Sequence, residues 1–435
     1  MNIFLKRFLF LALFLFIARD SAAITEEEQF KDWIIGQNYS YFKHGIDSES
    51  GFPYDHIVVE EDGSFLYGKY TSPSIVGLWM VLLADIIKGD LVLNDFSKVE
   101  AGRALLKTVK SIKRASKWKG FLYWYELKDG IEAAEDRVIS SYDNGNFALA
   151  LMVVSGAFID SKSSWQESIK REIDSILADQ KVGWDELYDR EAGLLCGAYR
   201  YGPVSYLWID RFYTEARLAA LVSLVLTDLP QGLWKKLLRD KNCPKGNYIL
   251  SNGCSVDFLK PWQGAFQAWL PLLFVPEMEV APPLKKMHSN YAAIQVDYAL
   301  KSNIPLLRSA AADPAGKDGE YCYEPALGIF NASEGWVRSD IAAPYATALL
   351  YPVDEKMSLD LFRKTLKSFP QILGPLGFYD SISEEGKVAK VYLAFDQLQL
   401  LLAFFYEVNQ DYFLSYLKSV SKGDLLKDLY SCIDF

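Results

Sequence analysis

Apolar residues recur at helical spacing along most of the chain, in segments separated by glycine, proline and aspartate. One segment begins at Ser72-Pro73, a capping serine followed by a proline at the first helical position, and continues through apolar positions to Ile86. Similar patterns predict further helices over residues 99–115, 144–158, 164–179, 214–226, 261–273, 287–302, 343–350, 358–368 and 396–408. Several of these segments are apolar nearly all round, which is typical of helices that are buried on every side.

Short extended segments rich in aromatic residues lie between the predicted helices, at 121–125, 194–201 and 378–382, and are predicted as strands or irregular loops. Roughly a dozen helices in buried-inner and amphipathic-outer pairs predict an all-α fold, an (α/α)6 toroid, although the pattern alone also allows an α-solenoid. The sequence has no repeat of fixed period and no linker rich in Pro, Gly or Ser. We therefore predict a single domain over residues 24–435.

Residues 1–23 have the layout of a secretory signal peptide. Lys6 and Arg7 precede an apolar run over 8–18 that is too short to span a bilayer comfortably, and the small residues of Ser21-Ala22-Ala23 follow. We expect this segment to be cleaved and the protein to be exported, either to a periplasm or to the medium. The alternative is an uncleaved N-terminal anchor. No later stretch is long and apolar enough to predict a membrane span.

The composition narrows the possible functions. Half of the residues are hydrophobic, so a sizeable core is expected, and the net charge of −10 argues against a nucleic-acid partner, whose phosphates need a basic face. The three histidines, His44, His56 and His288, lack metal-site spacing, which argues against a zinc enzyme and against a Ser-His-Asp hydrolase. The five cysteines are not a full disulfide framework, but a bridge between Cys243 and Cys254 remains possible in an exported protein.

Aromatic residues stand beside carboxylates and amides at the ends of the predicted elements. Such segments occupy 118–125, 140–146, 213–215, 260–264, 319–324, 377–380 and 392–397. Glycan sites need this mixture, because the C–H faces of sugar rings stack on aromatic rings and their hydroxyls bond to Asp, Asn and Gln. Glycosidic cleavage also needs two carboxyl groups, one protonated and one ionised, and burial raises the pKa of the acid. Glu215, at the head of an apolar predicted helix, is our first candidate for that acid.

Each of these residues also has a structural interpretation. Glu215 and Asp143 lie near predicted helix starts, where capping and the helix dipole favour carboxylates. Trp124 and Trp262 could be core residues, which is the commoner fate of tryptophan. Arg211 could be an ion-pair partner of Glu215 rather than a binding residue.

Taken in order, these segments resemble the bacterial glucoamylase-like family and its relatives active on β-1,2-glucans. Residues 70–77 resemble its T-S-P-[ST]-x-[IV]-[AG] helix start, and 140–146 include its S-x-D-x-G-N block. Further similar segments are 121–125, 212–221, 262–264, 270–276, 313–328, 343–347, 374–380 and 392–397. The resemblance implies an (α/α)6 toroid with its active cleft at one mouth, and hydrolysis or transglycosylation of glucans.

Three positions depart from the family pattern. Thr214 replaces the usual Asn or Ser before Glu215, Gln267 replaces a glutamate, and Leu398 replaces a small residue. The loss of a carboxylate at Gln267 motivates an alternative function, a non-catalytic exported glycan-binding or envelope-scaffold protein on the same toroid.

The leading hypothesis is a glycoside hydrolase or transglycosylase that acts on a glucan and needs no metal or organic cofactor. Glu215 is the expected general acid, and Asp143 is the first choice for the second carboxylate, with Glu324 and Asp380 as rivals. The expected substrate-binding residues are Trp124, Asn146, Trp262, Gln263, Tyr379, Asp396 and Gln397. The linkage, the endo or exo mode, the stereochemical outcome and the oligomeric state stay open.

Overall fold

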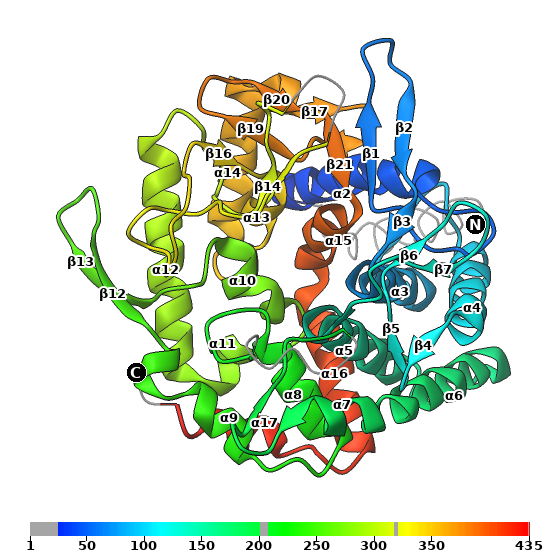
Figure 1. The fold of residues 1–435 in the computed structure, drawn as a ribbon. Coiled ribbons are helices and arrows are strands. Elements are labelled where there is room, and N and C mark those ends of the chain that lie inside the picture. Colours follow the sequence, from blue (N-terminus) through cyan, green and yellow to red (C-terminus); the bar gives the residue numbers. More distant parts are fainter. Residues whose placement is uncertain (1–24, 201–207, 317–320, 434) are drawn as a thin grey trace, which may run out of the picture.

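Helices make up most of the regular structure, and short antiparallel strands connect them (Figure 1). A computed structural model describes residues 25–200, 208–316, 321–433 and 435, so the predicted signal peptide lies outside the described residues. The helices are α2 (Glu26–His44), α3 (Pro73–Lys88), α4 (Lys98–Arg114), α5 (Ser141–Ala157), α6 (Ser164–Asp179), α7 (Lys181–Leu187), α8 (Arg217–Leu226), α9 (Gly232–Leu237), α10 (Ala265–Trp269), α11 (Glu277–Val280), α12 (Pro282–Lys301), α13 (Pro344–Ala348), α14 (Glu355–Ser368), α15 (Ala394–Leu402), α16 (Tyr406–Ser419) and α17 (Leu425–Tyr430).

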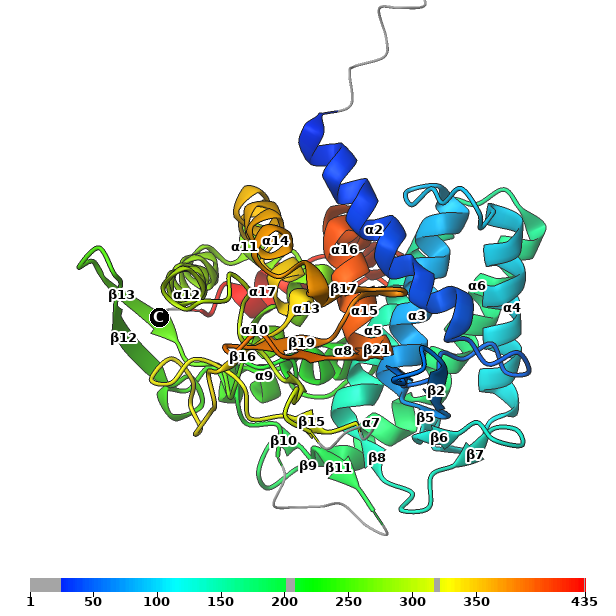
Figure 2. The same cartoon turned by 90° about the horizontal axis from the view of Figure 1, so that it is seen from above.

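The strands are short and mostly pair as two-stranded ribbons. They are β1 (His56–Val59), β2 (Phe65–Gly68), β3 (Tyr70–Thr71), β4 (Lys117–Trp118), β5 (Phe121–Leu122), β6 (Tyr125–Glu126), β7 (Glu132–Ala133), β8 (Ile139–Ser140), β9 (Tyr188–Asp189), β10 (Leu194–Leu195), β11 (Ala198–Tyr199), β12 (Lys245–Ile249), β13 (Ser255–Leu259), β14 (Ala311–Ala312), β15 (Tyr323–Glu324), β16 (Ile341–Ala342), β17 (Leu373–Gly374), β18 (Gly377–Phe378), β19 (Ser381–Ser383), β20 (Val388–Ala389) and β21 (Val391–Leu393). The β12–β13 hairpin projects from the body in both views (Figures 1 and 2).

The core is built around helices that are apolar on all sides. Every residue of α3 except Lys88 is buried, because the Ser72 cap, the N1 proline and an unbroken apolar run produce a helix with no polar face. Helix α3 packs against α5, α5 packs against α8, and α15 packs against α3. Since α15 also contacts α2, the C-terminal third of the chain lies against its beginning.

Amphipathic helices cover this core. Helix α4 begins at a capping box formed by Ser97 and Glu100, buries one apolar stripe that includes Leu105 and Val109, and packs against α3 and α6. Helices α6 and α14 likewise bury one face and expose charged residues on the other. No helix among the described residues is long and apolar enough to cross a membrane.

Several helix boundaries differ from those predicted from the sequence. Helix α8 begins at Arg217 instead of residue 214, because the bonds from Arg217 N to Thr214 O and from Leu218 N to Glu215 O form a tighter turn. The single helix predicted over 261–273 is α10 followed by a 3₁₀ helix, η2 (Leu270–Leu273), in which Pro271 has no backbone N–H to donate. The helix predicted over 396–408 is divided between α15 and α16, with the 3₁₀ helix η4 (Ala403–Phe405) between them.

The cysteine bridge that the sequence left open is not formed. Cys243 is buried before β12 and its thiol donates to the Leu237 carbonyl, whereas Cys254 is exposed near the tip of the β12–β13 hairpin. Hydrogen bonding of the two strands along their whole length holds these residues at opposite ends of the hairpin.

Candidate active site

Glu215 lies in the turn that precedes α8. Its Oε2 atom is enclosed and has no hydrogen-bond partner among the described residues. Burial is the main reason that the pKa of Glu215 rises from 4.5 to about 7; the charge of Asp143 also raises it, whereas a backbone hydrogen bond and Arg217 oppose the shift. Glu215 can therefore keep a proton near neutral pH, as a general acid must.

Asp143 stands beside Glu215 in the first turn of α5, where three elements orient its carboxylate. Its Oδ1 accepts a hydrogen bond of 2.7 Å from Ser74 Oγ on α3, and its Oδ2 accepts one of 3.1 Å from the Trp124 indole. Asn146 Nδ2 donates to the same Ser74 hydroxyl at 3.2 Å. The helix cap is Ser140, whose hydroxyl accepts from the Asp143 N–H, so the Asp143 carboxylate is free of the capping role that its position suggested.

Trp124 is not a core residue. Its side chain is 41 % exposed, and its ring stacks on Tyr70 with 6.3 Å between ring centroids and 14° between ring planes. Because the indole N–H bonds Asp143, the exposed ring is held beside the carboxylates. A fixed, exposed aromatic face of this kind suits a sugar ring.

A second carboxyl centre is formed by Asp380, just before β19, and Asp396, in the first turn of α15. The two carboxyl groups lie close enough for each to shift the pKa of the other, and Asp380 Oδ2 accepts from Ala312 N at 2.6 Å. Burial raises the pKa of Asp380 to about 6, and burial together with the charge of Asp380 raises that of Asp396 well above its usual range. The pair therefore shares one proton near neutral pH, since two adjacent buried carboxylates cannot both ionise readily.

The Tyr323 hydroxyl is influenced by the charges of both carboxyl centres. Burial of its hydroxyl raises the pKa of Tyr323 well above 10, and the charges of Asp396, Asp380 and Glu215 add to the shift, so this hydroxyl lies within electrostatic range of both centres. The side chain as a whole is 44 % exposed. Tyr323 was not among the site residues predicted from the sequence, although it lies in the aromatic and acidic segment 319–324.

Asp55 and His56 also border the second centre. Asp55 Oδ2 lies 3.0 Å from His56 Nδ1, and the charge of Asp55 contributes to the raised pKa values of Asp380 and Asp396. The His56 ring packs on Tyr321 with 4.4 Å between ring centroids. No local sequence signal pointed to these residues, because β1 reaches the site only by pairing with β21 at the other end of the chain.

Glu324 is not brought together with Glu215. It follows Tyr323 in strand β15, and neighbouring strand residues face opposite sides. Its carboxylate accepts from Ala326 N at 2.9 Å and lies 3.6 Å from Arg338, which also binds Asp313. Glu324 thus belongs to a salt-bridge cluster.

Tyr379 and Gln397 pack against the segments that carry Asp380 and Asp396. The Tyr379 ring is buried and stacks on Tyr392 with 4.9 Å between centroids. Gln397 Nε2 donates to the Phe378 carbonyl at 2.9 Å, and this bond ties α15 to β18. Both side chains are therefore engaged inside the protein and hold the segment that carries Asp380.

Gln267, the departure from the family pattern, has a local role. Its Oε1 accepts from Gln263 N at 2.7 Å, and its Nε2 donates to Gln263 Oε1 at 3.3 Å. This double contact, in which the amide both donates and accepts, fixes the loop before α10. Trp262 in the same loop is 44 % exposed and available to a ligand.

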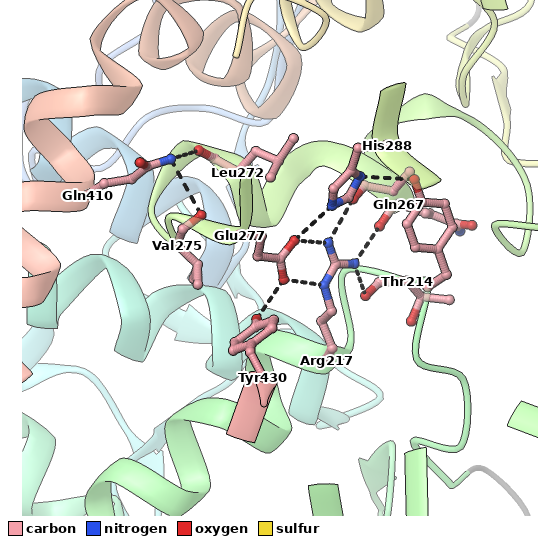
Figure 3. A network of polar contacts seen from close by, with 11 residues as sticks. Thr214, Arg217, Gln267, Leu272, Val275, Glu277, His288, Gln410 and Tyr430 are labelled. Atoms are coloured by element: carbon pink, nitrogen blue, oxygen red, sulfur yellow. Dashed lines mark hydrogen bonds and ion pairs between the residues drawn. The ribbon is translucent and has the colours of Figure 1, made fainter. Parts of the chain in front are cut away.

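A buried ionic network holds the turn that carries Glu215 (Figure 3). The fully buried Arg217 binds Glu277 through Nε at 2.8 Å and Nη2 at 2.7 Å, and donates to the carbonyls of Thr214 at 2.9 Å and Ala268 at 2.8 Å. Glu277 is also bound by the Tyr430 hydroxyl at 2.6 Å. The Arg217 guanidinium group thus joins the turn before α8 to α10, because it donates hydrogen bonds to one carboxylate and to two backbone carbonyls.

Arg211 is not the ion-pair partner of Glu215 that the sequence suggested. Its Nε lies 2.7 and 2.8 Å from the two carboxylate oxygens of Glu334. No ion pair neutralises the Glu215 carboxylate among the described residues, which agrees with its raised pKa.

A cavity of about 950 Å³ opens beside the second centre, between the β1–β2 hairpin, Ala312, Tyr321 and residues 387–391. Glu215 and Asp143 are not among the residues that line it. We therefore place the candidate active site at the carboxyl groups of Glu215, Asp380 and Asp396. The cavity lies next to this site and is not its centre. The described residues contain no group of three or more His, Cys, Asp and Glu side chains that could hold a metal ion.

The fold is shared with glucoamylase-like proteins and β-1,2-glucanases of known structure. An endo-β-1,2-glucanase from Talaromyces funiculosus, solved with sophorose, superposes with a TM-score of 0.80 at 14 % identity over 94 % of this chain and 91 % of that one. A glucoamylase candidate from Bacteroides fragilis has a TM-score of 0.74 at 17 % identity, covering 94 % and 98 %. An endo-β-1,2-glucanase from Chitinophaga pinensis, solved with sophorotriose and glucose, has 0.72 at 16 %, covering 93 % and 98 %.

At these identities the likeness shows the fold alone. No protein-family model and no curated protein matches this chain.

Proposed function

We propose that this protein is a glycoside hydrolase of glucans, with β-1,2-linked glucan as the first substrate to test. The observation that carries the proposal is a pair of carboxyl centres around Tyr323, one of which keeps a proton near neutral pH while the other shares one between two aspartates. Glycosidic cleavage needs one protonated and one ionised carboxyl group. We further propose that the helices form an (α/α)6 toroid and that the mature single domain is exported.

In the proposed reaction Glu215 donates its proton to the glycosidic oxygen as the bond to the anomeric carbon breaks. A water molecule adds to that carbon and loses its proton to the ionised member of the Asp380–Asp396 pair. Proton and charge then balance, because one proton leaves Glu215 and one arrives at the pair. Each transfer of this type contributes roughly 10²- to 10⁴-fold to the rate.

Asp143 has a different role in this proposal. Its carboxylate is held by Ser74 and Trp124 and its charge raises the pKa of Glu215, so it keeps the acid protonated. The exposed Trp124 ring would stack on a sugar bound beside it. Asp143 is therefore a positioning residue, and the role of second carboxylate, for which it was the first choice, passes to the aspartate pair.

The solved neighbours support the choice of substrate. The Talaromyces enzyme was crystallised with sophorose and, as a glutamate-to-glutamine mutant, with β-1,2-glucan. The alternative of a glycan binder without activity was motivated by Gln267. Since the Gln267 amide is engaged with Gln263, its replacement of a glutamate leaves both carboxyl centres in place.

The test is to incubate the purified protein with β-1,2-, β-1,3- and α-glucans and to follow the release of oligosaccharides. We expect release from β-1,2-glucan and a loss of about 10²- to 10⁴-fold in Glu215→Gln. An aryl glucoside oligomer with a good leaving group should recover much of that loss, because its departure needs no proton. Glu324→Gln is the matched control and should stay active.

Unchanged release by Glu215→Gln would remove Glu215 from the acid role. A complete absence of release, together with retained oligosaccharide binding in calorimetry, would favour the glycan binder.

A further inference from the structure

Two strongly exposed tryptophans lie on adjoining loops near the Glu215 turn. Trp262 is 44 % exposed and Trp336 is 70 % exposed. The loops are joined by backbone hydrogen bonds, from Glu334 N to Pro261 O at 2.8 Å and from Gly335 N to Trp262 O at 3.2 Å. Indole rings bury a large area when they bind a ligand, and grouped exposed aromatics are typical of interaction sites.

These loops are tied to the turn that carries the candidate acid. Glu334 binds Arg211 with both carboxylate oxygens, at 2.7 and 2.8 Å, and the Arg211 carbonyl accepts from Thr214 Oγ1 at 3.2 Å. The Ser333 hydroxyl donates to the Gln263 carbonyl. The chain of contacts from the Trp336 loop to the Glu215 turn therefore runs through one ion pair and a few residues, and it fixes the backbones of the two loops relative to that turn.

We propose that Trp262 and Trp336 form an aromatic platform that binds sugar units of a glucan chain away from the bond that is cut. The substrate class rests on the proposed function, whereas the platform rests on the exposure of the two rings and the anchoring of the two loops. Trp124, bound to Asp143 on α5, provides a separate aromatic contact beside the carboxylates. Exposed aromatic rings thus come from separate loops that are tied to Asp143 and to the Glu215 turn, an arrangement that suits a chain extending beyond one bound sugar.

A platform of this kind predicts a dependence on chain length. A short oligosaccharide that fills only the sugar positions at Glu215 cannot reach Trp336, and a longer one can stack on it. Loss of the Trp336 ring should therefore lower kcat/KM for long β-1,2-gluco-oligosaccharides by roughly 5- to 10-fold and leave that for the shortest cleaved one unchanged. Because Trp336 is mostly exposed, its removal should leave the melting temperature unchanged.

The experiment compares Trp336→Ala, Trp336→Phe and Trp165→Ala over a series of β-1,2-gluco-oligosaccharides of defined length. Trp165 is a matched control, since it is 42 % exposed but lies on α6, in the outer groove between α4 and α6. We expect Trp336→Ala to lose the advantage of long chains, Trp336→Phe to recover most of it, and Trp165→Ala to behave as the wild type. Binding of the same oligosaccharides is measured by calorimetry in Glu215→Gln, with and without Trp336→Ala.

Equal activity of Trp336→Ala and wild type on the long chains, or an equal loss at every length, would overturn the platform and leave the hydrolase proposal intact. A wild type that cuts no glucan would overturn the hydrolase proposal. The platform would then stand if Trp336→Ala still weakened binding of the long oligosaccharide, and it would fall if binding were unchanged or absent.

Discussion

The protonation state of the Glu215 carboxyl group is set by its surroundings. An exposed glutamate would be ionised at neutral pH, but the enclosed Oε2 atom of Glu215 has no partner within the described part of the chain and faces the charge of Asp143. Arg217, two residues further on, is committed to Glu277 and only partly offsets these effects. A protonated glutamate beside a well-bonded aspartate is the charge distribution that general acid catalysis needs.

The first prediction concerns Asp143→Asn. Because the charge of Asp143 raises the pKa of Glu215, its removal should lower that pKa and move the alkaline limb of the pH–kcat/KM profile to lower pH. The enzyme should keep substantial activity below the new limb. The measurement is hydrolysis of β-1,2-glucan across pH, with Glu324→Gln as the control whose limb stays in place. A loss of all activity at every pH would instead make Asp143 the base.

A second prediction at this scale concerns stability. The folded pKa of Glu215, about 7, lies above its unfolded value of 4.5, so the folded state binds the proton more tightly and loses stability as pH rises through this window. Glutamine stays neutral, so Glu215→Gln should match the wild type near pH 4 and exceed its free energy of unfolding by about 3 kcal/mol near pH 9. Urea unfolding at both pH values measures the difference, and equal curves at high pH would contradict the raised pKa.

At the scale of elements, the close packing of three buried helices sets the distance between Asp143 and Glu215. Gly145 on α5 lies against Ala219 on α8, where an added Cβ would stand 2.8 Å from the Ala219 Cα. Gly77 on α3 lies as closely against Phe147 on α5. These glycines let the helix backbones approach, and that approach brings Ser74, Asp143 and the turn before α8 to one place.

Gly145→Ala should therefore destabilise the protein, although alanine is the better helix former. The new methyl group forces α5 and α8 apart, at a cost of about 1–3 kcal/mol, and should shift the alkaline limb set by Glu215. Gly36→Ala on α2 is the matched control, since no described atom would lie within 4 Å of its Cβ, and it should be neutral or stabilising by up to about 1 kcal/mol. Urea unfolding checks both, and a stabilised Gly145→Ala would mean that the helices tolerate the wider spacing.

At the scale of the whole molecule, the second carboxyl centre is completed where an early and a late segment of the described chain meet. Strand β1 pairs with β21, which puts Asp55 beside Asp396, and the Phe378 N–H donates to Asn38 Oδ1 of α2 at 2.9 Å. Contacts of α15 with α2 and α3 complete the closure. The acid and the aspartate pair therefore come from different thirds of the sequence.

This arrangement predicts a bell-shaped dependence of kcat/KM on pH. The acid limb should follow the Asp380–Asp396 pair, which must ionise with an apparent pKa near 6, and the alkaline limb should follow Glu215, which must keep its proton up to about 7. The rate should peak between about pH 6 and 7. Initial rates on β-1,2-glucan over about pH 4 to 9 provide the profile.

Asp380→Asn should remove most of the activity in that assay, by about 10²-fold or more, because the pair loses its base. A rate that stays level from about pH 5 to 8 would contradict the assignment of both limbs.

Some helix starts and one candidate site residue could be predicted from the sequence alone. The cap and apolar run of α3, and the apolar periodicity of α6, predicted helices whose starts agree with the structure, because a helix start depends on a few neighbouring residues. Glu215 could be singled out as a carboxylate at the head of an apolar segment. The later start of α8 could not, since it depends on the contact of Arg217 with the Thr214 carbonyl and with Glu277.

The sequence by itself thus determined the helical class, the order of its buried segments and which aromatic and acidic residues deserved a test. Only the tertiary structure decided how they combine: Asp380 pairs with Asp396, Tyr323 faces the carboxyl groups while Glu324 joins Arg338, and Tyr379 turns into the core. The reason is physical, because periodicity and capping act over one or two helical turns. A carboxyl pKa, by contrast, depends on which charges and apolar groups the fold brings within a few ångströms.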